Sequence, residues 1–299
     1  MPNPKRIFVT TDFSPCAEYA VGYAAELARR LGAAITLGHV VDTGYLTYAA
    51  LYGEGVVVDP DVHSVEEAAQ RRLAQSVAEI TARGIAATGD FARGTPATEL
   101  ARMIKSSGAM LVVIGTHGHT GFNRFLFGST CEKLLRQSPA PVLAIRQPEP
   151  EAVFNADTFA LERIACTTDL SDLSRSVLPF AAELCATVDA ELVVVHVLDS
   201  RLDALPYAAV DAPYHGHFRE RAETVLKEWT QWLKAPKVHI RVLQGIPSDI
   251  IGDFVRDHDV DLLVMATHGH SGLAHALLGS TTERVVRTAP CPVLAIRPK

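Results

Sequence analysis

Short apolar runs alternate with longer helical patterns along this chain. Runs such as residues 111–114 and 192–195 are apolar at every position. A strand that is buried on both faces has this pattern, and strands separated by helices favour a parallel sheet with helices on both sides. Each half has the order β-α-β-α-β-α-β-α-β. The pattern therefore predicts an α/β fold with two open, five-stranded parallel sheets.

The predicted elements of the first half point to one edge of the sheet as the binding edge. We expect strands at 7–11, 35–41, 86–92, 110–115 and 142–145, and helices at 16–31, 64–83, 96–107 and 129–138. Open sheets of this class bind ligands beyond the carboxyl ends of their strands, where the strand order reverses. Side chains that directly follow the first, second and fourth strands are therefore the candidates for a site.

The second half of the chain repeats the first. Residues 115–146 align without a gap with residues 266–297 and are identical at 18 of 32 positions. The segment R-I-F-V-T-T-D-F-S at 6–14 likewise matches R-I-A-C-T-T-D-L-S at 163–171. An internal repeat of this size predicts two copies of one domain in a single chain.

The repeats also predict where the domains and their loops lie. We expect one domain at 1–147, a second at 158–299 and a linker rich in proline and charge at 148–157, with the domains related by an approximate two-fold axis. The early segments are offset by 157 residues and the late ones by 151, so six residues of difference fall inside the repeat. Length variation of this kind predicts surface loops at 43–63 and 200–213.

Composition narrows the class of protein. Hydrophobic residues make up 48% of the chain and charged residues 21%, which is typical of a globular domain. The formal charge of -6 offers no basic surface for a phosphate backbone, so we expect no nucleic-acid partner. There is no signal-peptide pattern and no apolar run near 18 residues, so we expect a cytoplasmic protein without membrane insertion. The five cysteines show no C-x-x-C spacing, which argues against a disulfide framework or a thiolate zinc site.

A glycine-rich loop follows the fourth predicted strand. It reads Gly115-x2-Gly118-x9-Gly128-Ser129-Thr130, and Ser129 opens a helix. Glycines allow positive φ and close approach of backbone to a ligand, and amide groups at a helix start attract anions, so the loop suggests a phosphate site. The alternative is a capping box formed by Ser129 and Glu132, with the glycines serving only turns. The second half repeats the arrangement.

An aspartate ends the first strand of each half, at Asp12 and Asp169, in the context T-T-D-[FL]-S. A carboxylate at this edge of a sheet can accept hydrogen bonds from ribose hydroxyls. It can equally serve the start of the following helix, and both roles are open. Neither the G-x-x-x-x-G-K-[ST] pattern nor G-x-G-x-x-G occurs, so the chain is not a P-loop ATPase or a classical dinucleotide enzyme on motif grounds.

Together, T-T-D-F-S, H-V-V-D, G-x2-G-x9-G-S-T and P-V-L-A-I-R resemble the ATP-binding class of the universal stress protein superfamily. The resemblance covers nearly all of both halves and implies a Rossmann-like, adenine nucleotide alpha hydrolase-like fold. It implies a first site at Asp12, Val41, Gly115, Gly118, Gly128, Ser129 and Thr130. It implies a second site at Asp169, Val197, Gly269, Gly279, Ser280 and Thr281.

The same resemblance implies a ligand, a role and an assembly. The ligand would be ATP, ADP or AMP, with or without Mg²⁺, and the protein would act in stress signalling in response to nucleotide rather than as a metabolic enzyme. Relatives pair through their last strands. Residues 142–146 and 293–297 would therefore pair in an intramolecular pseudo-dimer, and a homodimer is a further arrangement.

One position departs from the motif. Ala266 stands where the first copy has Gly115. If that glycine is needed for close approach of the backbone to the ligand, the methyl group of alanine adds bulk beside the ligand and penalises a positive φ, so we expect the N-terminal site to bind ATP more tightly.

Histidines in the glycine loops support a different interpretation. His117 and His119 form H-G-H in the first copy, and His268 and His270 form it in the second. Imidazole is a common zinc ligand, but no carboxylate or cysteine accompanies these pairs at a recognised spacing. A slow ATP hydrolase is another alternative, although the motifs assign no lysine or arginine to a departing phosphate.

Overall fold

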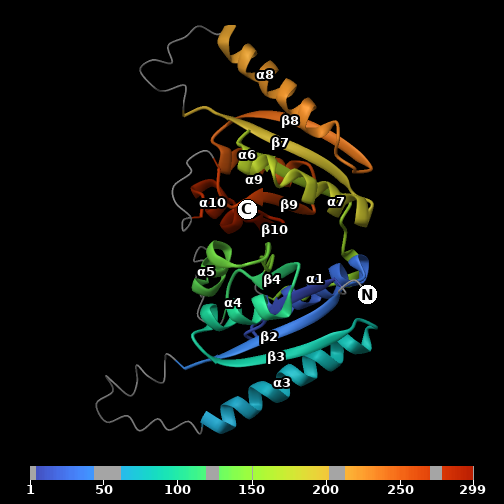
Figure 1. The fold of residues 1–299 in the computed structure, drawn as a ribbon, viewed down its shortest axis with the longest axis vertical. Coiled ribbons are helices and arrows are strands. Elements are labelled where there is room, and N and C mark those ends of the chain that lie inside the picture. The colour runs from blue at the N-terminus through green and yellow to red at the C-terminus, as the bar shows by residue number, and fades with distance from the viewer. Residues whose placement is uncertain are drawn as a thin grey trace, which may run out of the picture. The chain divides into compact units, whose positions relative to one another are not determined.

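A computed structural model describes residues 5–43, 62–118, 128–149, 151–201, 213–269 and 278–298. The chain divides into two compact units, residues 1–157 and 158–299. Each unit is a parallel sheet with helices packed against it (Figure 1).

The first unit has the predicted order of strands and helices. Its strands are β1 (Arg6–Thr10), β2 (Ala34–Asp42), β3 (Ala87–Gly94), β4 (Leu111–Gly115) and β5 (Val142–Ile145). Its helices are α1 (Pro15–Leu31), α3 (Val62–Ala82), α4 (Pro96–Ser107) and α5 (Ser129–Gln137). The sheet order is β3-β2-β1-β4-β5, with every pair parallel. The strand order reverses beside β1, so the predicted binding edge lies at the carboxyl ends of β1 and β4.

The second unit repeats this topology. Its strands are β6 (Arg163–Thr168), β7 (Glu191–Asp199), β8 (Lys237–Gly245), β9 (Leu262–Ala266) and β10 (Val293–Ile296). Its helices are α6 (Asp172–Arg175), α7 (Leu178–Val188), α8 (Pro213–Thr230), α9 (Pro247–Asp257) and α10 (Ser280–Thr288). The parallel order β8-β7-β6-β9-β10 matches that of the first unit. The predicted α/β fold with tandem sheets is therefore confirmed.

The units differ in the helix that follows the first strand. In the first unit this helix, α1, is continuous, whereas in the second it is split into α6 and α7. Pro179 lies in the first turn of α7. Proline fits a helix start because it has no amide hydrogen to donate, and it disfavours a helix that continues through it. The repeat comparison did not predict this break.

The central strand anchors each core. Ile7, Phe8 and Val9 in β1 are fully buried, and so are Ile164 and Ala165 in β6. A strand that is covered on both faces must be apolar at every position, which is the pattern in the sequence. The buried strand is thus fixed between its neighbours, and its last residues are held at the binding edge.

Part of the predicted linker packs against the first unit. The ring of Phe154 makes edge-on contacts with Tyr19 and Tyr23 of α1, at 5.5 and 6.1 Å between ring centroids. A Cβ atom at Gly22 would come within 2.8 Å of Phe154, so glycine there makes room for the ring. The domain limits, the two-fold relation and the pairing of residues 142–146 with 293–297 stay predictions.

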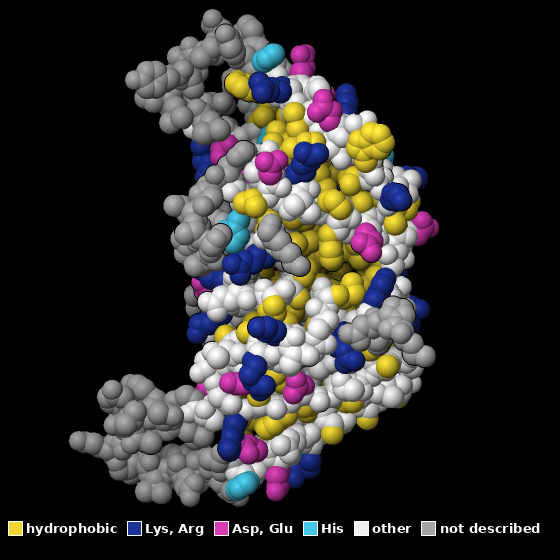
Figure 2. Space-filling view, in the orientation of Figure 1, with side chains coloured by type: hydrophobic (Ala, Val, Ile, Leu, Met, Phe, Trp, Pro, Cys, Tyr) yellow, Lys and Arg dark blue, Asp and Glu magenta, His cyan; other side chains and the backbone are white. Residues whose placement is uncertain are grey.

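Two further features concern the surface and the loops. Among the described helices, none is both long and apolar enough to cross a membrane. Basic and acidic side chains are interspersed over both units on the face that Figure 2 shows. Most of the two predicted surface loops, 43–63 and 200–213, lies outside the described residues.

Substitution of Gly38 tests the packing of the first sheet, and substitution of Gly252 in a helix of the second unit serves as the comparison. A Cβ at Gly38 in β2 would overlap the buried ring of Phe8, whereas a Cβ at Gly252 in α9 would meet open space. We expect Gly38→Ala to lower the free energy of unfolding by about 1–3 kcal/mol through overpacking. We expect Gly252→Ala to raise it by about 0.5–1 kcal/mol, because alanine favours a helix over glycine. Urea unfolding followed by circular dichroism measures both, and a Gly38→Ala protein as stable as the parent would contradict this packing.

Candidate functional site

A cavity opens at the predicted edge of each sheet. The cavity of the first unit has a volume of about 250 Å³ and that of the second about 490 Å³. Among the predicted site residues, those that line the first are Asp12, Gly115, Gly118, Gly128, Ser129 and Thr130. Those that line the second are Asp169, Val197, Gly269, Gly279, Ser280 and Thr281. The fold therefore brings together residues that lie more than a hundred positions apart in sequence.

Val41 is the one predicted residue that does not line the first cavity; its neighbours Val40 and Asp42 do. Backbone groups of successive residues in a parallel strand face opposite neighbours. The carbonyl of Gly38 accepts from Thr11 on the β1 side, so the backbone of Val40 faces that side too, beyond the end of β1. The backbone of Val40 is therefore better placed than that of Val41 to contact a ligand in the cavity. The backbone of Val41 faces β3 instead.

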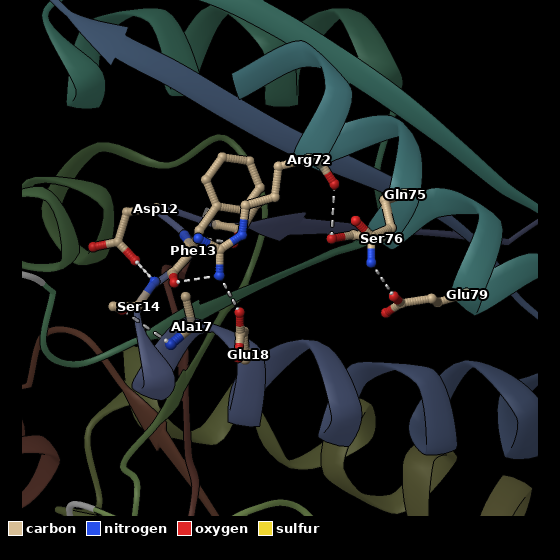
Figure 3. Close-up of polar contacts among 10 residues, drawn as sticks. Asp12, Phe13, Ser14, Ala17, Glu18, Arg72, Gln75, Ser76 and Glu79 are labelled. Carbon is tan, nitrogen blue, oxygen red and sulfur yellow. Dashed lines mark hydrogen bonds and ion pairs between the residues drawn. The ribbon is translucent and has the colours of Figure 1, made fainter. Parts of the chain in front are cut away.

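The turn after β1 shows whether Asp12 caps the helix that follows it. The Oδ1 atom of Asp12 accepts from the Ser14 amide at 3.0 Å (Figure 3). The Thr11 hydroxyl accepts from the Phe13 amide at 2.9 Å. The cap of α1 is Ser14, whose hydroxyl accepts from the Ala17 amide at 3.3 Å. Asp12 thus shapes the turn but is not the helix cap.

The second unit builds the same turn. Asp169 Oδ1 accepts from the Ser171 amide at 3.0 Å, and the Thr168 hydroxyl accepts from the Leu170 amide at 3.0 Å. Ser171 caps α6 by accepting from the Ser174 amide at 3.2 Å. The Ser171 hydroxyl also donates to Asp169 Oδ1 at 2.6 Å. Both aspartates are therefore held by the residue two positions on, as in an Asx turn.

Two of the loop glycines make room for a carboxylate, a purpose that was not predicted. A Cβ at Gly118 would overlap Oδ2 of Asp12, and a Cβ at Gly269 would overlap Oδ2 of Asp169. Among the described glycines, positive φ occurs elsewhere, and at none of the predicted site glycines. The prediction that these glycines supply positive φ is therefore wrong. Glycine is needed at these two positions so that the carboxylate can lie against the loop backbone.

Gly115 is explained by helix packing. A Cβ there would lie 3.0 Å from Sγ and 3.2 Å from the carbonyl oxygen of Cys16, in the first turn of α1. Cys16 is not among the residues that line the cavity. The second unit, where Ala266 takes this position, splits the corresponding helix and has the larger cavity. Gly115 does not have a positive φ, so the part of the argument for a weaker second site that rests on backbone angle is wrong, while the expected difference in affinity stays a prediction.

The helices that follow the glycine loops begin at the cavities. The N-caps of α5 and α10 are Gly128 and Gly279, and neither helix start receives a cap from a described side chain. Glu132 pairs instead with Arg136, at 2.8 Å. The capping-box alternative is therefore wrong. First-turn amides have no acceptor within their own helix, so they can bind an anion in the cavity.

One histidine of each H-G-H pair lies at the cavity wall. His117 and His268 each have Nδ1 2.8 Å from the hydroxyl of the preceding, buried threonine. His119 and His270 lie outside the described residues. Within the part of the chain that is described, no three His, Cys, Asp or Glu side chains are grouped closely enough to hold a metal ion.

Cys131 also lines the first cavity. It is buried, and this burial raises the pKa of its thiol. The side chain is therefore a protonated, apolar part of the wall and not a reactive thiolate.

Some site features were not predicted from the sequence. Phe13 and Leu170 adopt left-handed φ values of 63° and 65°, a conformation that costs a bulky side chain about 1–3 kcal/mol. His39 binds the Thr11 carbonyl through Nδ1 at 2.8 Å and stacks on Phe13 at 4.3 Å. His196 repeats the carbonyl contact, at 2.9 Å from Thr168. The sequence did contain a signal for the two histidines, because His39 and His196 occupy the same position in the repeated motif H-V-[VL]-D.

Arg201 also lines the second cavity and was not predicted as a site residue. It lies at the wall and is held by Asp199, with Nε 2.9 Å from Oδ1 and Nη2 2.5 Å from Oδ2. This ion pair lowers the pKa of Asp199. The corresponding position of the first copy is Gly44, in the region of variable length, so the repeat gave no signal for it.

Residues 3–146 and 160–297 each match the same family model, which describes the universal stress protein family. The chain belongs to the universal stress protein family. It is similar to a universal stress protein of Mycolicibacterium smegmatis, with 27% identity and coverage of 98% of this chain and 97% of that one. A universal stress protein of Methanocaldococcus jannaschii is 32% identical over 46% of this chain and 82% of its own length.

A solved structure shares the tandem architecture. The crystal structure of a universal stress protein from Archaeoglobus fulgidus matches with a TM-score of 0.69 and 21% identity, and the match covers 98% of both chains. This likeness shows that the fold is shared along the whole chain. The two units are therefore tandem universal stress protein domains, called domain 1 and domain 2 below.

The buried His39 predicts how the stability of domain 1 depends on pH. Burial lowers its pKa below 6.5, Arg72 adds to this, and the Thr11 carbonyl and Asp12 oppose it. The unfolded chain therefore binds the proton more readily, and stability is lost as pH falls from about 7.5 toward about 5.5. His39→Asn should reduce this dependence by at most about 1.4 kcal/mol per pH unit.

Urea unfolding at a series of pH values measures the effect. His63→Asn, a change at an exposed position of the same domain, is the matched control. Equal pH dependence in the parent and His39→Asn proteins would show that His39 is not the group responsible.

Proposed function

We propose that each domain binds an adenine nucleotide, ATP or its products ADP and AMP, at its strand-end cavity. The observation that carries the proposal is the same arrangement in both domains: a carboxylate after the first strand lines the same cavity as the uncapped start of the helix after the glycine loop. The carboxylates are Asp12 and Asp169. A nucleotide has matching chemistry, because its ribose hydroxyls donate hydrogen bonds and its phosphates accept them.

The end of the second strand offers a place for the base. Strand β2 continues to Asp42, whereas β1 ends at Thr10, which pairs with Gly38. Val40 is paired with β3 on one side, and its backbone faces the cavity on the other side, beyond the end of β1; Val197 has the equivalent position in β7. An adenine edge has both a donor and an acceptor, which suits an unpaired stretch of strand backbone.

Each cavity also offers groups for the phosphates. In domain 1 these are the first-turn amides at Ser129 and Thr130, and in domain 2 those at Ser280 and Thr281. Arg201 adds a cation at the wall of the second cavity only. A Mg²⁺ ion bound with the nucleotide would take its oxygen ligands mainly from the phosphates and from water.

In the cell, nucleotide occupancy would let the protein respond to adenylate levels, as the family resemblance suggests for a stress and signalling role. Binding to the folded state would raise its stability in proportion to the logarithm of nucleotide concentration. The proposal includes an intramolecular pseudo-dimer built by the last strand of each domain.

Matched aspartate variants test the proposal. Asp12→Ala should weaken ATP binding to domain 1 by about 1–3 kcal/mol, because a charged hydrogen bond to ribose is lost. Asp169→Ala should do the same in domain 2. Calorimetric titration should show two sites in the parent protein, one weakened site in each single variant and two in the double variant. Asp12→Asn is the control, since it keeps an acceptor for the Ser14 amide and removes the charge.

Three outcomes would count against the proposal. A parent protein that ignores ATP, ADP and AMP in calorimetry and releases none of them on denaturation does not bind adenine nucleotides. Zinc found by elemental analysis in protein purified without a His tag would instead favour the metal-binding alternative. Reduced stability with unchanged affinity in Asp12→Ala would show that the aspartate serves only the turn.

A further inference from the structure

Arg72 reaches from α3 to the turn that carries Asp12. Its Nη2 atom donates to the Phe13 carbonyl at 3.2 Å and to Glu18 Oε1 at 2.6 Å (Figure 3). The centre of its guanidinium group also lies 4.9 Å from the centroid of the Phe13 ring. One side chain thus joins α3, the turn after β1 and the first turns of α1.

The turn needs such support because of the conformation of Phe13. Its φ of 63° is one that L side chains rarely adopt, and an aromatic residue adopts it only where surrounding contacts enforce it. Phe13 lies between Asp12 and Ser14, whose amide donates to Asp12 Oδ1. If Phe13 relaxed to an ordinary φ, this hydrogen bond would break and the carboxylate would turn away from Gly118.

We propose that Arg72 is a positioning residue for the nucleotide site of domain 1, holding the Phe13 turn so that Asp12 points into the cavity. The inference rests on the proposed function. A simpler role is a surface ion pair with Glu18, since both side chains are more than half exposed and such pairs contribute little. That role does not account for the carbonyl and ring contacts, which need the planar fork of arginine.

Domain 2 supplies an internal comparison. The residue equivalent to Phe13 is Leu170, which has the same left-handed φ but no ring for a cation to face. The guanidinium group of Arg175 instead lies over Trp229, at 5.2 Å, and so links α6 to α8. Removal of Arg72 should therefore affect the first site and leave the second unchanged.

The first experiment isolates domain 1 in the full chain. In an Asp169→Ala background, which weakens the second site, ATP binding to the site of domain 1 is measured by calorimetry as the tighter phase for Arg72→Ala, Arg72→Lys and Arg71→Ala. The matched control is Arg71, the adjacent residue, which pairs with Glu67 on the exposed face of the same helix at 3.3 Å. We expect Arg72→Ala to raise the Kd roughly tenfold, the scale on which residues supporting a ligand-binding side chain act. Arg71→Ala should bind like its parent.

Lysine at position 72 separates charge from geometry. An ammonium group cannot make the carbonyl, carboxylate and ring contacts together, so Arg72→Lys should stay weaker than the parent. Full recovery of affinity with lysine, or an Arg72→Ala protein that binds as well as Arg71→Ala, would overturn the proposal.

A double-mutant cycle tests whether Arg72 acts through Asp12. Once Asp12→Ala is present, Arg72→Ala should change the Kd little further, because the carboxylate that it positions is gone. If each substitution instead raises the Kd by the same factor with and without the other, Arg72 acts on ATP by another route, and the proposal is overturned.

The last measurement needs no nucleotide. Hydrogen exchange by NMR follows the Ser14 amide, which is protected by Asp12 Oδ1. It should exchange several-fold faster in Arg72→Ala and stay unchanged in Arg71→Ala; unchanged exchange in both overturns the inference. Faster exchange with no ATP binding in any protein would refute the proposed function while leaving the role of Arg72 in the turn intact.

Discussion

The burial of β1 and β6 on both faces is the constraint on which each domain depends. An inner strand of this kind has hydrogen-bonded neighbours on both edges and helices over both faces, so it cannot shift without breaking both. Because β1 ends before β2, the chain must turn at the mouth of the sheet, and it does so with Thr11 and Asp12. The same strand that fills the core therefore positions Asp12, the carboxylate that we propose binds ribose.

Close packing, not unusual backbone angles, explains the glycines around the cavity. Gly118 and Gly269 leave space for a carboxylate, Gly115 for the first turn of α1, and Gly128 for the carbonyl of Thr116. The strained angles lie one residue beyond the aspartates, at Phe13 and Leu170. Strain of this kind persists where contacts enforce it, and in domain 1 His39 and Arg72 both contact the strained residue.

The two domains keep one topology but have diverged around their cavities. Domain 2 divides the helix after its first strand, adds Arg201 at the cavity wall and replaces Phe13 by Leu170. Each change alters volume or charge beside the same conserved turn geometry. Under the proposed function, unequal cavities would let the two domains bind a nucleotide with different affinities. The contacts of Arg72 also link the cavity of domain 1 to α3.

The sequence alone determined the repeat, the family and the order of elements, because burial on both faces and helical periodicity are local patterns. The strand at 142–145 was predicted to the residue. Tertiary structure decided three other matters: that Val40 rather than Val41 faces the cavity, that Gly118 accommodates Asp12, and that Arg72 supports Phe13. Each depends on strand register or on contacts between elements up to a hundred residues apart, and no local pattern of residues encodes those distances.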